Sequence, residues 1–380
     1  MTAVALVFWV ALALILYTHV GYALLLRGLA TLGSRRAVAP GDGQEPSVTV
    51  IVAAHDEAAV IARKVQNMLE LDYPPERLEL VVASDGSSDA TVEIARAARS
   101  GRSLRVLELP RRGKVPTQDA AVEQAAGEIL AFSDANAFWE AHALRALVRP
   151  FADPRVGYVC GELVYLAPDG SNQEGLYWRY ENWVRRLESR VGSVTAGNGA
   201  IYAVRRAAYM RLDPRTSHDL AFPFNMVKRG WRALYEPAAL AAERPVASVE
   251  GEFRRKRRMM SHAWPVVLGG GMLDPRGYGP VYALEILSHR VVRYVTPLLH
   301  VLVLGTNVAL LGEGWVYAAT LAGQLALLAG AALSGPLHGR PRILALCRYY
   351  VLMTASLAAG LWDALRHGTP ATWEREAERP

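Results

Sequence analysis

The sequence has very few cysteines: Cys160 and Cys347 are the only two in 380 residues. Two cysteines exclude a disulfide framework and a cysteine-based metal cluster, and so small a number suits a reducing compartment. Cys347 lies in an apolar stretch, where a thiol is most simply a small buried side chain.

Charged side chains are missing from long stretches near both ends of the chain, where the hydrophobic residues, 52% of the whole sequence, are concentrated. Residues 4–26 carry no charge and are followed by Arg27, Arg35 and Arg36. Because about 20 apolar residues suffice to cross a bilayer, we expect a transmembrane helix over 4–26. The arginines after it place the next domain in the cytoplasm. The alternative is a signal peptide, which is disfavoured because no Lys or Arg precedes this long run.

The second region of this kind is residues 294–362. Residues 294–311 and 315–339 are uncharged and are joined by a short turn, which predicts a transmembrane hairpin. Residues 343–362 span the bilayer only if Arg348 snorkels to the surface, and otherwise they are re-entrant or interfacial. We therefore expect two or three spans here, with the side on which the C-terminal tail lies left open.

Residues 282–293 precede this hairpin and alternate apolar and polar side chains at helical spacing. Such a helix lies along a membrane surface or packs as an ordinary amphipathic helix of a soluble domain. The pattern does not distinguish these two alternatives.

The chain is mildly basic, with a formal net charge of +6. This excess suits arginines that flank a membrane and sites for anionic phosphates at least as well as nucleic acid. The densest basic cluster, Arg254–Arg258, lacks interleaved aromatic residues, and the chain has no motif that reads bases. We therefore expect no nucleic-acid partner.

Residues 47–261 have the pattern of a cytoplasmic α/β domain. Short apolar runs alternate with segments of helical periodicity, which predicts a doubly wound, mainly parallel sheet. The expected strands are 47–54, 78–83, 104–109 and 129–133, and the expected helices are 57–71, 89–100 and 118–126.

Acidic side chains gather where these strands end, which is where such sheets bind ligands. Any one of them can cap a helix instead, and capping is the preferred interpretation for Ser88 and Asp89. Asp85 and Asp134 end two different strands. On one rim the two carboxylates would repel unless a positive group lay between them, and a divalent cation bound to a diphosphate satisfies this requirement.

Six motifs then follow in a fixed order: Asp56-Glu57, Asp85-Gly86-Ser87, Gly113-Lys114, Asp134-Ala135-Asn136, Gly197-Asn198-Gly199 and a late acid, Asp219. The order of these motifs resembles that of glycosyltransferase family 2. The basic cluster followed by membrane helices makes the chain similar to the membrane-integrated branch of that family, which includes cellulose, chitin and hyaluronan synthases. The resemblance covers 47–261. It implies a nucleotide-sugar-binding domain of the GT-A type, with a sugar transferred from a nucleotide-sugar donor, most simply a UDP-sugar.

The resemblance also implies how the donor is held. Glu57 and Asp85 would bind the ribose and the uracil edge, since carboxylates accept hydrogen bonds from both. Lys114 would bind the diphosphate or the base, unless it lies in a solvated basic loop. Asp134 would bind Mg²⁺ or Mn²⁺, and the neutral Asn136 would add a carbonyl oxygen or a hydrogen bond.

Asp219 stands where the family has its catalytic base, which takes a proton from the acceptor hydroxyl. A single displacement of this kind inverts the anomeric configuration. As alternatives, Asp219 caps a helix, and His218, which replaces the family's first acid, is a neighbour that tunes the carboxylate or a surface residue. A sugar would approach the chain closely at the small loop of Gly197, Asn198 and Gly199. The alternative is that these residues form a tight turn before a strand at 200–204.

Two departures from the family pattern are visible. Processive synthases have a Gln-x-x-Arg-Trp motif near Arg258, but here only the arginine matches and Met259 replaces the tryptophan. Arg255 and Arg258 would still bind diphosphate, or anionic membrane lipid, or both. The second departure is Thr117-Gln118-Asp119, where the family commonly has Ala-Leu-Asn.

The predicted function is therefore an inverting, metal-dependent sugar transfer to a saccharide or lipid-linked acceptor, at the cytoplasmic face of the plasma membrane. An inactive membrane scaffold or partner subunit is the alternative, favoured by the two departures and by His218. A transporter is less consistent with the chain, because few polar groups lie within its apolar segments. The donor sugar, the acceptor and any partner proteins are not specified by the sequence.

Overall fold

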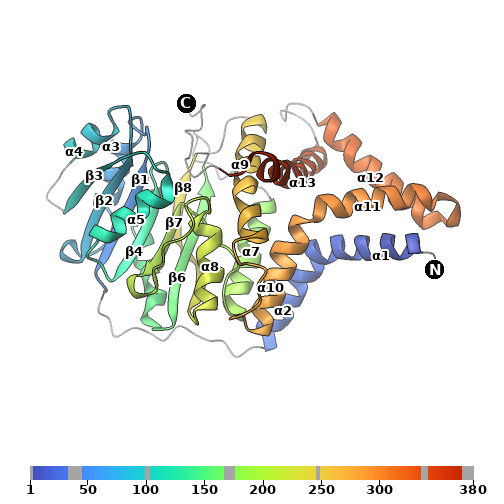
Figure 1. Ribbon diagram of the computed structural model, residues 1–380, viewed down its shortest axis with the longest axis horizontal. Coiled ribbons are helices and arrows are strands. Elements are labelled where there is room, and N and C mark those ends of the chain that lie inside the picture. Colours follow the sequence, from blue (N-terminus) through green and yellow to red (C-terminus); the bar gives the residue numbers. More distant parts are fainter. Residues whose placement is uncertain are drawn as a thin grey trace.

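The structure is a computed structural model that describes residues 3–32, 45–98, 103–166, 176–244, 249–334 and 341–369. It consists of an α/β domain built on one sheet and a group of apolar helices that extends away from that domain (Figure 1). The N-terminal helix lies at the far end of the apolar group.

The sheet has eight strands in the order β3-β2-β1-β4-β7-β6-β8-β5. Strands β1 to β4 are mutually parallel, as the sequence predicts, whereas β7 runs antiparallel to both β4 and β6. The α/β fold class is thus confirmed, and the sheet is mixed beyond β4. The strand bounds are β1 Val48–Ala54, β2 Leu78–Asp85, β3 Leu104–Leu109, β4 Ile129–Asp134, β5 Phe138–Trp139, β6 Val156–Tyr165, β7 Ile201–Arg205 and β8 Arg232–Glu243.

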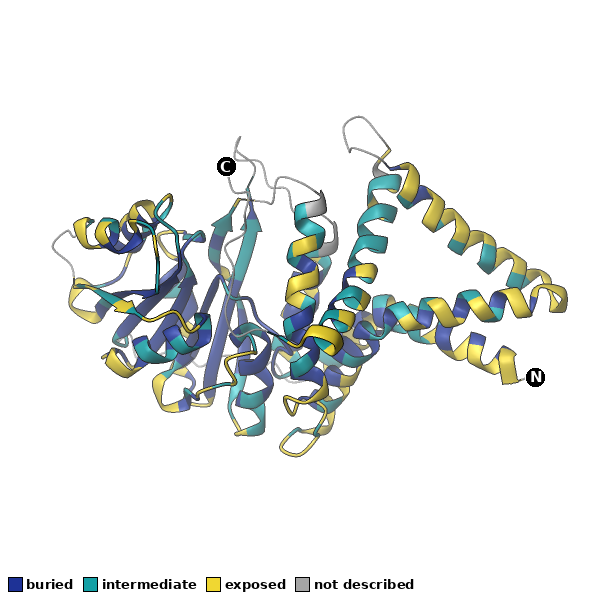
Figure 2. Cartoon of the chain, turned by 45° about the horizontal axis from the view of Figure 1, so that its top comes forward, coloured by how far each residue is buried: buried dark blue, intermediate teal, exposed yellow. Residues whose placement is uncertain are grey.

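Helices cover both faces of this sheet, so successive residues of a strand enter different cores. Val50 of β1 packs in one core with Leu144, whereas its neighbour Ile51 packs in the other with Phe132 and Phe222. Figure 2 shows the central strands buried along most of their length, whereas the edge strand β3 has no fully buried residue. The helices of this domain are α3 Ile61–Leu69, α4 Thr91–Ala97, α5 Lys114–Gln124, α6 Ala143–Val148, α7 Leu176–Val191, α8 His218–Lys228 and α9 Val249–Leu268.

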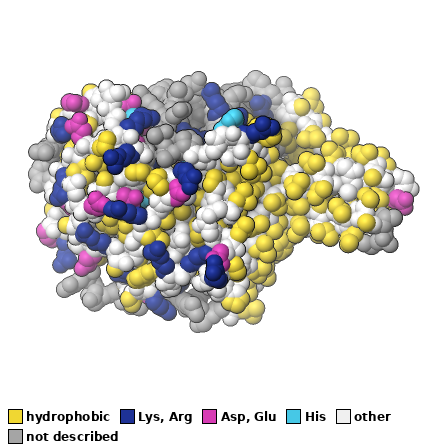
Figure 3. All heavy atoms as spheres, in the orientation of Figure 1, with side chains coloured by type: hydrophobic (Ala, Val, Ile, Leu, Met, Phe, Trp, Pro, Cys, Tyr) yellow, Lys and Arg dark blue, Asp and Glu magenta, His cyan; other side chains and the backbone are white. Residues whose placement is uncertain are grey.

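The apolar group contains α1, α2, α11, α12 and α13. Among the described residues three helices are long and apolar enough to cross a membrane, 3–32, 315–333 and 343–367, or four with a bent pair described below. Side chains on this part of the surface are almost all hydrophobic (Figure 3). The element bounds are α1 Ala3–Leu16, a π-helical turn Tyr17–Gly21, α2 Tyr22–Leu32, α11 Thr296–Ala309, α12 Trp315–Leu333 and α13 Arg342–His367.

The segment predicted at 282–293 forms α10 (Pro280–Glu285) and a π-helical stretch, Ile286–Val292, which meets α11 at an angle of 61°. Its polar residues His289 and Arg290 are buried, whereas Leu284 and Leu287 are exposed. The same segment also buries Tyr282, Ile286 and Val292, so apolar side chains lie on both of its sides. The exposed apolar side suits contact with lipid.

The last helix, α13, returns to the α/β domain and packs against α9. The two helices approach so closely that a Cβ at Gly360 would lie 2.5 Å from the Cβ of Met260. Arg257 pairs with Asp363 through two contacts of 2.6 Å. The C-terminal part of the predicted third apolar segment is therefore fixed to the domain.

Candidate active site

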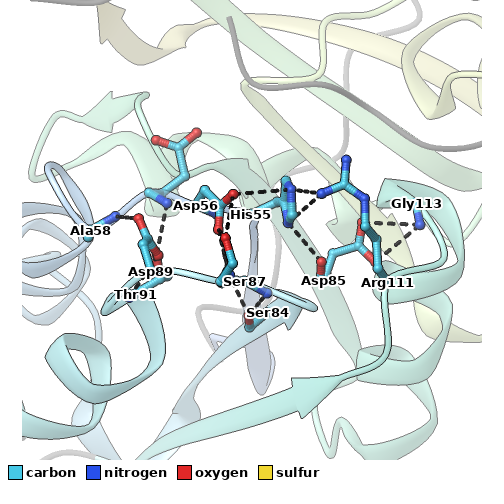
Figure 4. A network of polar contacts seen from close by, with 12 residues as sticks. His55, Asp56, Ala58, Ser84, Asp85, Ser87, Asp89, Thr91, Arg111 and Gly113 are labelled. Carbon is cyan, nitrogen blue, oxygen red and sulfur yellow. Dashed lines mark hydrogen bonds and ion pairs between the residues drawn. The ribbon is translucent and has the colours of Figure 1, made fainter. Parts of the chain in front are cut away.

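The ends of β1 and β2 are joined by a network of polar contacts (Figure 4). His55 donates from Nδ1 to the carbonyl oxygen of Asp85 over 2.8 Å, and the Arg111 guanidinium contacts the same imidazole. Asp56 has a left-handed backbone, with a φ of 52°, and its carboxylate accepts a bond of 2.7 Å from the Ser88 amide. These contacts hold the two strand ends in one rigid rim.

Glu57 follows in this rim. Its backbone N–H donates to the Thr91 hydroxyl over 2.8 Å, and its carbonyl accepts from Val60 and Ile61. The backbone of Glu57 therefore begins the turn into α3, while its side chain is partly exposed. Asp89, predicted to be a cap, accepts from the amide of Thr91 and from Ala58 and so performs a capping role.

Asp85 is completely buried. Its carboxylate accepts from the backbone amides of Arg112 and Gly113, over 2.7 and 3.1 Å, and from the Thr117 hydroxyl over 3.1 Å. Gly86 allows this approach, because its φ is 61° and a Cβ there would lie 2.8 Å from the Arg111 amide nitrogen. Asp85 thus fixes the loop that carries Lys114.

Lys114 is the first residue of α5, and its ammonium group pairs with the Asp134 carboxylate at the end of β4. Both side chains remain about a quarter exposed, at 28% and 27%. A Cβ at Gly199 would lie 3.8 Å from the Lys114 Nζ and 3.8 Å from the Asp134 Oδ2. Gly199 therefore borders this ion pair, so three of the predicted site residues lie together.

Glu243 and Lys64 lie beside the turn after Asp134, and neither belongs to the motifs described above. The Asn136 amide donates to Glu243 at the end of β8. Lys64 is fully buried and donates to the Ser133 hydroxyl over 2.7 Å and to the Ala137 carbonyl. Desolvation lowers the pKa of Lys64 to about 7.

Lys64 does carry a signal in the sequence. It shares the apolar face of α3 with Ile61, Val65 and Met68, all of which are buried. A lysine at a core position of an amphipathic helix is unusual, because a buried ammonium group is costly unless it is hydrogen-bonded. The position of Lys64 therefore indicates that a buried hydrogen-bond acceptor lies near its ammonium group, but it does not indicate which residue supplies that acceptor.

Asp219 lies in the first turn of α8, where Ser217 occupies the N-cap position. Its carboxylate makes no hydrogen bond or ion pair with any residue that the structure describes, so it does not act as a cap. The neighbouring His218 is buried, with its Nδ1 2.8 Å from the Tyr202 hydroxyl. Desolvation lowers the pKa of His218 to about 3, so its imidazole is neutral near pH 7.

The loop at 197–199 is held by its own contacts. The Asn198 amide donates to the Gly161 carbonyl over 2.6 Å, and its Oδ1 accepts from the amides of Ala200 and Ile201. Asn198 thus shapes the turn before β7, in agreement with the alternative stated above. Gly197 is confined by packing, and Gly199 is the member of this loop that lines the pocket described next.

A pocket of about 130 Å³ lies between the start of α5 and the start of α8. It brings together Lys114, Gly199 and Asp219, which are far apart in the sequence. Its lining residues are Lys114, Val115, Gln118, Gly199, Tyr202, Pro214, Thr216, Ser217, His218, Asp219 and His262.

The basic cluster of α9 is divided among several partners. Arg255 forms a two-point contact with Glu252, with both distances 3.0 Å, and donates to the Tyr165 hydroxyl. Lys256 is buried, with its Nζ 4.5 Å from the centre of the Trp178 ring. Arg258 is exposed and lies one helical turn before His262, whose side chain lines the pocket. These basic residues therefore do not form one continuous surface patch.

Comparison with known proteins agrees with this architecture. The family model "Glycosyltransferase like family 2" matches residues 46–261. The chain is 24% identical over 208 residues to a poly-beta-1,6-N-acetyl-D-glucosamine synthase of Staphylococcus aureus, a match that covers 51% of this chain and 48% of the relative. It is 31% identical over 170 residues to a beta-monoglucosyldiacylglycerol synthase of Synechocystis, covering 42% and 35%.

Among solved structures, the fold is similar to that of a mannosyltransferase from Pyrobaculum calidifontis in complex with GDP-Man and Mn²⁺. The TM-score is 0.72 at 25% identity, and the match covers 95% of this chain and 99% of the other. The match therefore includes the apolar helices as well as the α/β domain. By contrast, the chain spans about half the length, or less, of the curated relatives it matches.

Proposed function

The chain belongs to glycosyltransferase family 2, and we propose that it transfers a sugar from a nucleotide-sugar donor to an acceptor hydroxyl with inversion at the anomeric carbon. The donor proposed from the sequence is a UDP-sugar. The mannosyltransferase with a similar fold was solved with GDP-Man, so the tests include both nucleotides.

One observation carries this proposal: Asp219 lines the same pocket as Lys114, whose ammonium group pairs with Asp134. Asp219 is on the side of α8 and has no partner among the described residues, as suits a base that receives a proton. Lys114 is at the start of α5, where a cation can stabilise the diphosphate that leaves. A sugar held between them would be attacked from the side of Asp219.

A divalent cation, Mg²⁺ or Mn²⁺, would be held by Asp134, with Asn136 beside it. No group of three His, Cys, Asp or Glu side chains suited to a metal occurs among the described residues. This arrangement fits a metal bound by one carboxylate and by substrate phosphates, as is common for Mg²⁺. Such a metal stabilises the negative charge of the departing diphosphate. The Mn²⁺ in the similar mannosyltransferase complex supports this assignment.

The other donor contacts remain proposals. Glu57 and Asp85 would lie nearest the nucleoside, Asp85 by shaping the loop over which the base binds. Arg255 and Arg258 would approach the diphosphate from α9, where Arg258 is exposed one helical turn before His262 of the pocket lining.

We propose a saccharide or lipid-linked acceptor, which would approach near residues 197–199. The named relatives are a synthase of a saccharide polymer and a synthase of a glucosyldiacylglycerol, so both acceptor classes occur among them. The apolar helices would keep the site at a membrane, as a multi-pass protein of the plasma membrane with its α/β domain in the cytoplasm. Contact with membrane lipid is part of this proposal.

The test uses the full chain in detergent or in native membranes. With Mg²⁺ or Mn²⁺ present, it should release the nucleoside diphosphate from one of a panel of UDP- and GDP-sugars. Asp219→Asn should abolish transfer while nucleotide binding persists, because the amide cannot accept the proton of the acceptor hydroxyl.

Asp72→Asn is the matched control, since Asp72 lies on the surface in contact with His142 and Arg145. It should leave turnover unchanged. Turnover like that of the unmodified protein in Asp219→Asn would contradict the assignment of the base. Absence of nucleotide binding in the unmodified protein would favour the inactive scaffold.

A further inference from the structure

Two side chains in the pocket have buried polar atoms without a hydrogen-bond partner among the described residues. Gln118 is 1% exposed, and both its Oε1 and its Nε2 lack a partner. His218 is 5% exposed, and its Nε2 also lacks one. Both residues line the pocket with Lys114 and Asp219. Both also stand where the chain departs from the pattern of its family, as noted above.

Buried polar groups without partners are rare in folded proteins and are costly, so each one calls for a functional or structural reason. An apolar residue at position 118 would avoid this cost. Gln118 lies four residues after Lys114 and hence on the same face of α5. Gln118 is buried on that helix and lines the pocket together with Lys114.

The chemistry of these atoms is specific. A glutamine amide offers two donors and one acceptor, and a neutral imidazole offers one of each. With the Tyr202 hydroxyl bonded to Nδ1 of His218, the Nε2 atom is the one that remains to contact a ligand. A phosphate would satisfy donors but not the Gln118 carbonyl oxygen. Hydroxyl groups both donate and accept, so they can satisfy every one of these atoms.

The position of the pocket indicates which hydroxyls these are. Lys114 on one side borders the proposed diphosphate, and Asp219 on the other is the proposed base. The group that lies between a leaving diphosphate and the attacking oxygen is the sugar being transferred.

We propose that Gln118 and His218 form a subsite that binds hydroxyl groups of the sugar being transferred, and so determine which donor sugar this protein accepts. The inference rests on the proposed function, since it assumes that a nucleotide-sugar occupies the site. It goes further by assigning the recognition of the sugar ring to these two side chains.

The experiment measures binding of a nucleoside diphosphate and of the corresponding nucleotide-sugar to the full chain in detergent, by isothermal titration calorimetry. The difference between the two affinities reports contacts made by the sugar alone. In Gln118→Leu this difference should fall by about tenfold, the effect of losing one or two hydrogen bonds, while the affinity for the bare diphosphate is kept. Gln124→Leu, at the exposed end of the same helix, is the matched control and should change neither affinity.

A second readout separates this role from a structural one. Because the Gln118 amide has no partner among the described residues, Gln118→Leu should raise the melting temperature of the ligand-free protein. A residue that supports the fold would lower it. Donor sugars that each lack one hydroxyl should identify the hydroxyl that each residue binds. If Gln118 binds a given hydroxyl, Gln118→Leu should lose no further affinity when the donor lacks that hydroxyl, and the same holds for His218→Phe.

The outcomes are distinct. An unchanged sugar-dependent difference in both variants would overturn the inference while leaving the proposed function intact. An unchanged difference with a raised KM for the acceptor would also overturn it, and would place the acceptor in this pocket. If the unmodified protein binds neither the nucleotide nor the nucleotide-sugar, the proposed function fails and this inference fails with it.

Discussion

The backbone N–H of Gly197 donates a hydrogen bond of 2.8 Å to the carbonyl oxygen of Asp219. This bond ties the loop before β7 to the first turn of α8, so the position of the proposed base depends on the shape of that loop. Residue 197 is also packed tightly, because a Cβ there would lie 2.0 Å from the Tyr158 hydroxyl oxygen. A change at a residue that need not touch the substrate can therefore displace Asp219.

The first prediction concerns Gly197→Ala. We expect the added methyl group to destabilise the protein by about 1–3 kcal/mol, the usual cost of overpacking, and to lower kcat by displacing Asp219. Thermal unfolding and turnover measure the two effects. Tyr158→Phe should partly restore both in the double variant, since it removes the closest atom and its own hydroxyl has no partner among the described residues. Equal losses in the single and double variants would contradict this explanation.

The second prediction concerns competition for Asp134. Because the Lys114 ammonium pairs with this carboxylate, a metal ion must displace it. Lys114→Met should therefore bind Mn²⁺ more tightly without nucleotide, while its affinity for the nucleoside diphosphate falls by about tenfold or more. Mn²⁺ titration followed by electron paramagnetic resonance tests the first part. Asp134→Asn should lose Mn²⁺ binding, Lys228→Met is the control, and unchanged metal affinity in both site variants would rule out Asp134 as the ligand.

The third prediction follows from the buried Lys64. Its pKa is lowered from the ordinary value of 10.5 to about 7, first because burial removes its hydration. Between pH 7 and about pH 10 the unfolded chain binds a proton at this lysine that the folded chain does not, so this group makes stability rise with pH. Lys64→Met lacks this dependence.

From pH 7 to pH 9, the free energy of unfolding of the unmodified protein should therefore rise by about 2 kcal/mol relative to that of Lys64→Met. In melting temperature this amounts to about 4–8 °C. Scans in one detergent across this range measure it, with Lys228→Met at a partly exposed lysine as the control. A constant difference would show that Lys64 does not remain buried and hydrogen-bonded beside the Asp134 turn.

The fourth prediction concerns Glu188, a buried carboxylate where the N-terminal helix meets the α/β domain. It accepts from the Tyr22 hydroxyl over 2.7 Å, from the Thr195 amide over 3.0 Å and from His289 over 2.7 Å. Glu188→Gln leaves the nearby buried Arg290 without this counter-charge, and we expect a loss of about 3–5 kcal/mol. Thermal unfolding measures it against Glu76→Gln, a change at an exposed residue.

Because Thr195 leads into the loop that holds Asp219, the folded fraction of Glu188→Gln should also turn over more slowly. Normal stability together with normal turnover would show that the N-terminal helix and the active-site loop are not coupled through this carboxylate.

The sequence by itself was sufficient for features that depend on local spacing. The alternation of strands and helices up to Asp134, the long apolar segments and the acids at strand ends all reflect the backbone geometry of a few neighbouring residues. For this reason the predicted strands agree with β1 to β4 closely, and Asp85, Lys114 and Asp134 do converge on one edge of the sheet.

Tertiary structure decided what lies beyond that range. The antiparallel pairing of β7 with β4 places Tyr202 and the 197–199 loop beside a strand about 70 residues earlier in the chain. His218 and Asp219 at the start of α8 are placed there as well, because His218 contacts the Tyr202 hydroxyl. Packing also placed Lys64 next to the turn after Asp134 and left Gln118 facing a pocket. Local periodicity cannot specify these contacts between distant residues, because they depend on how the whole chain buries its apolar surface and on which buried polar groups find hydrogen-bond partners.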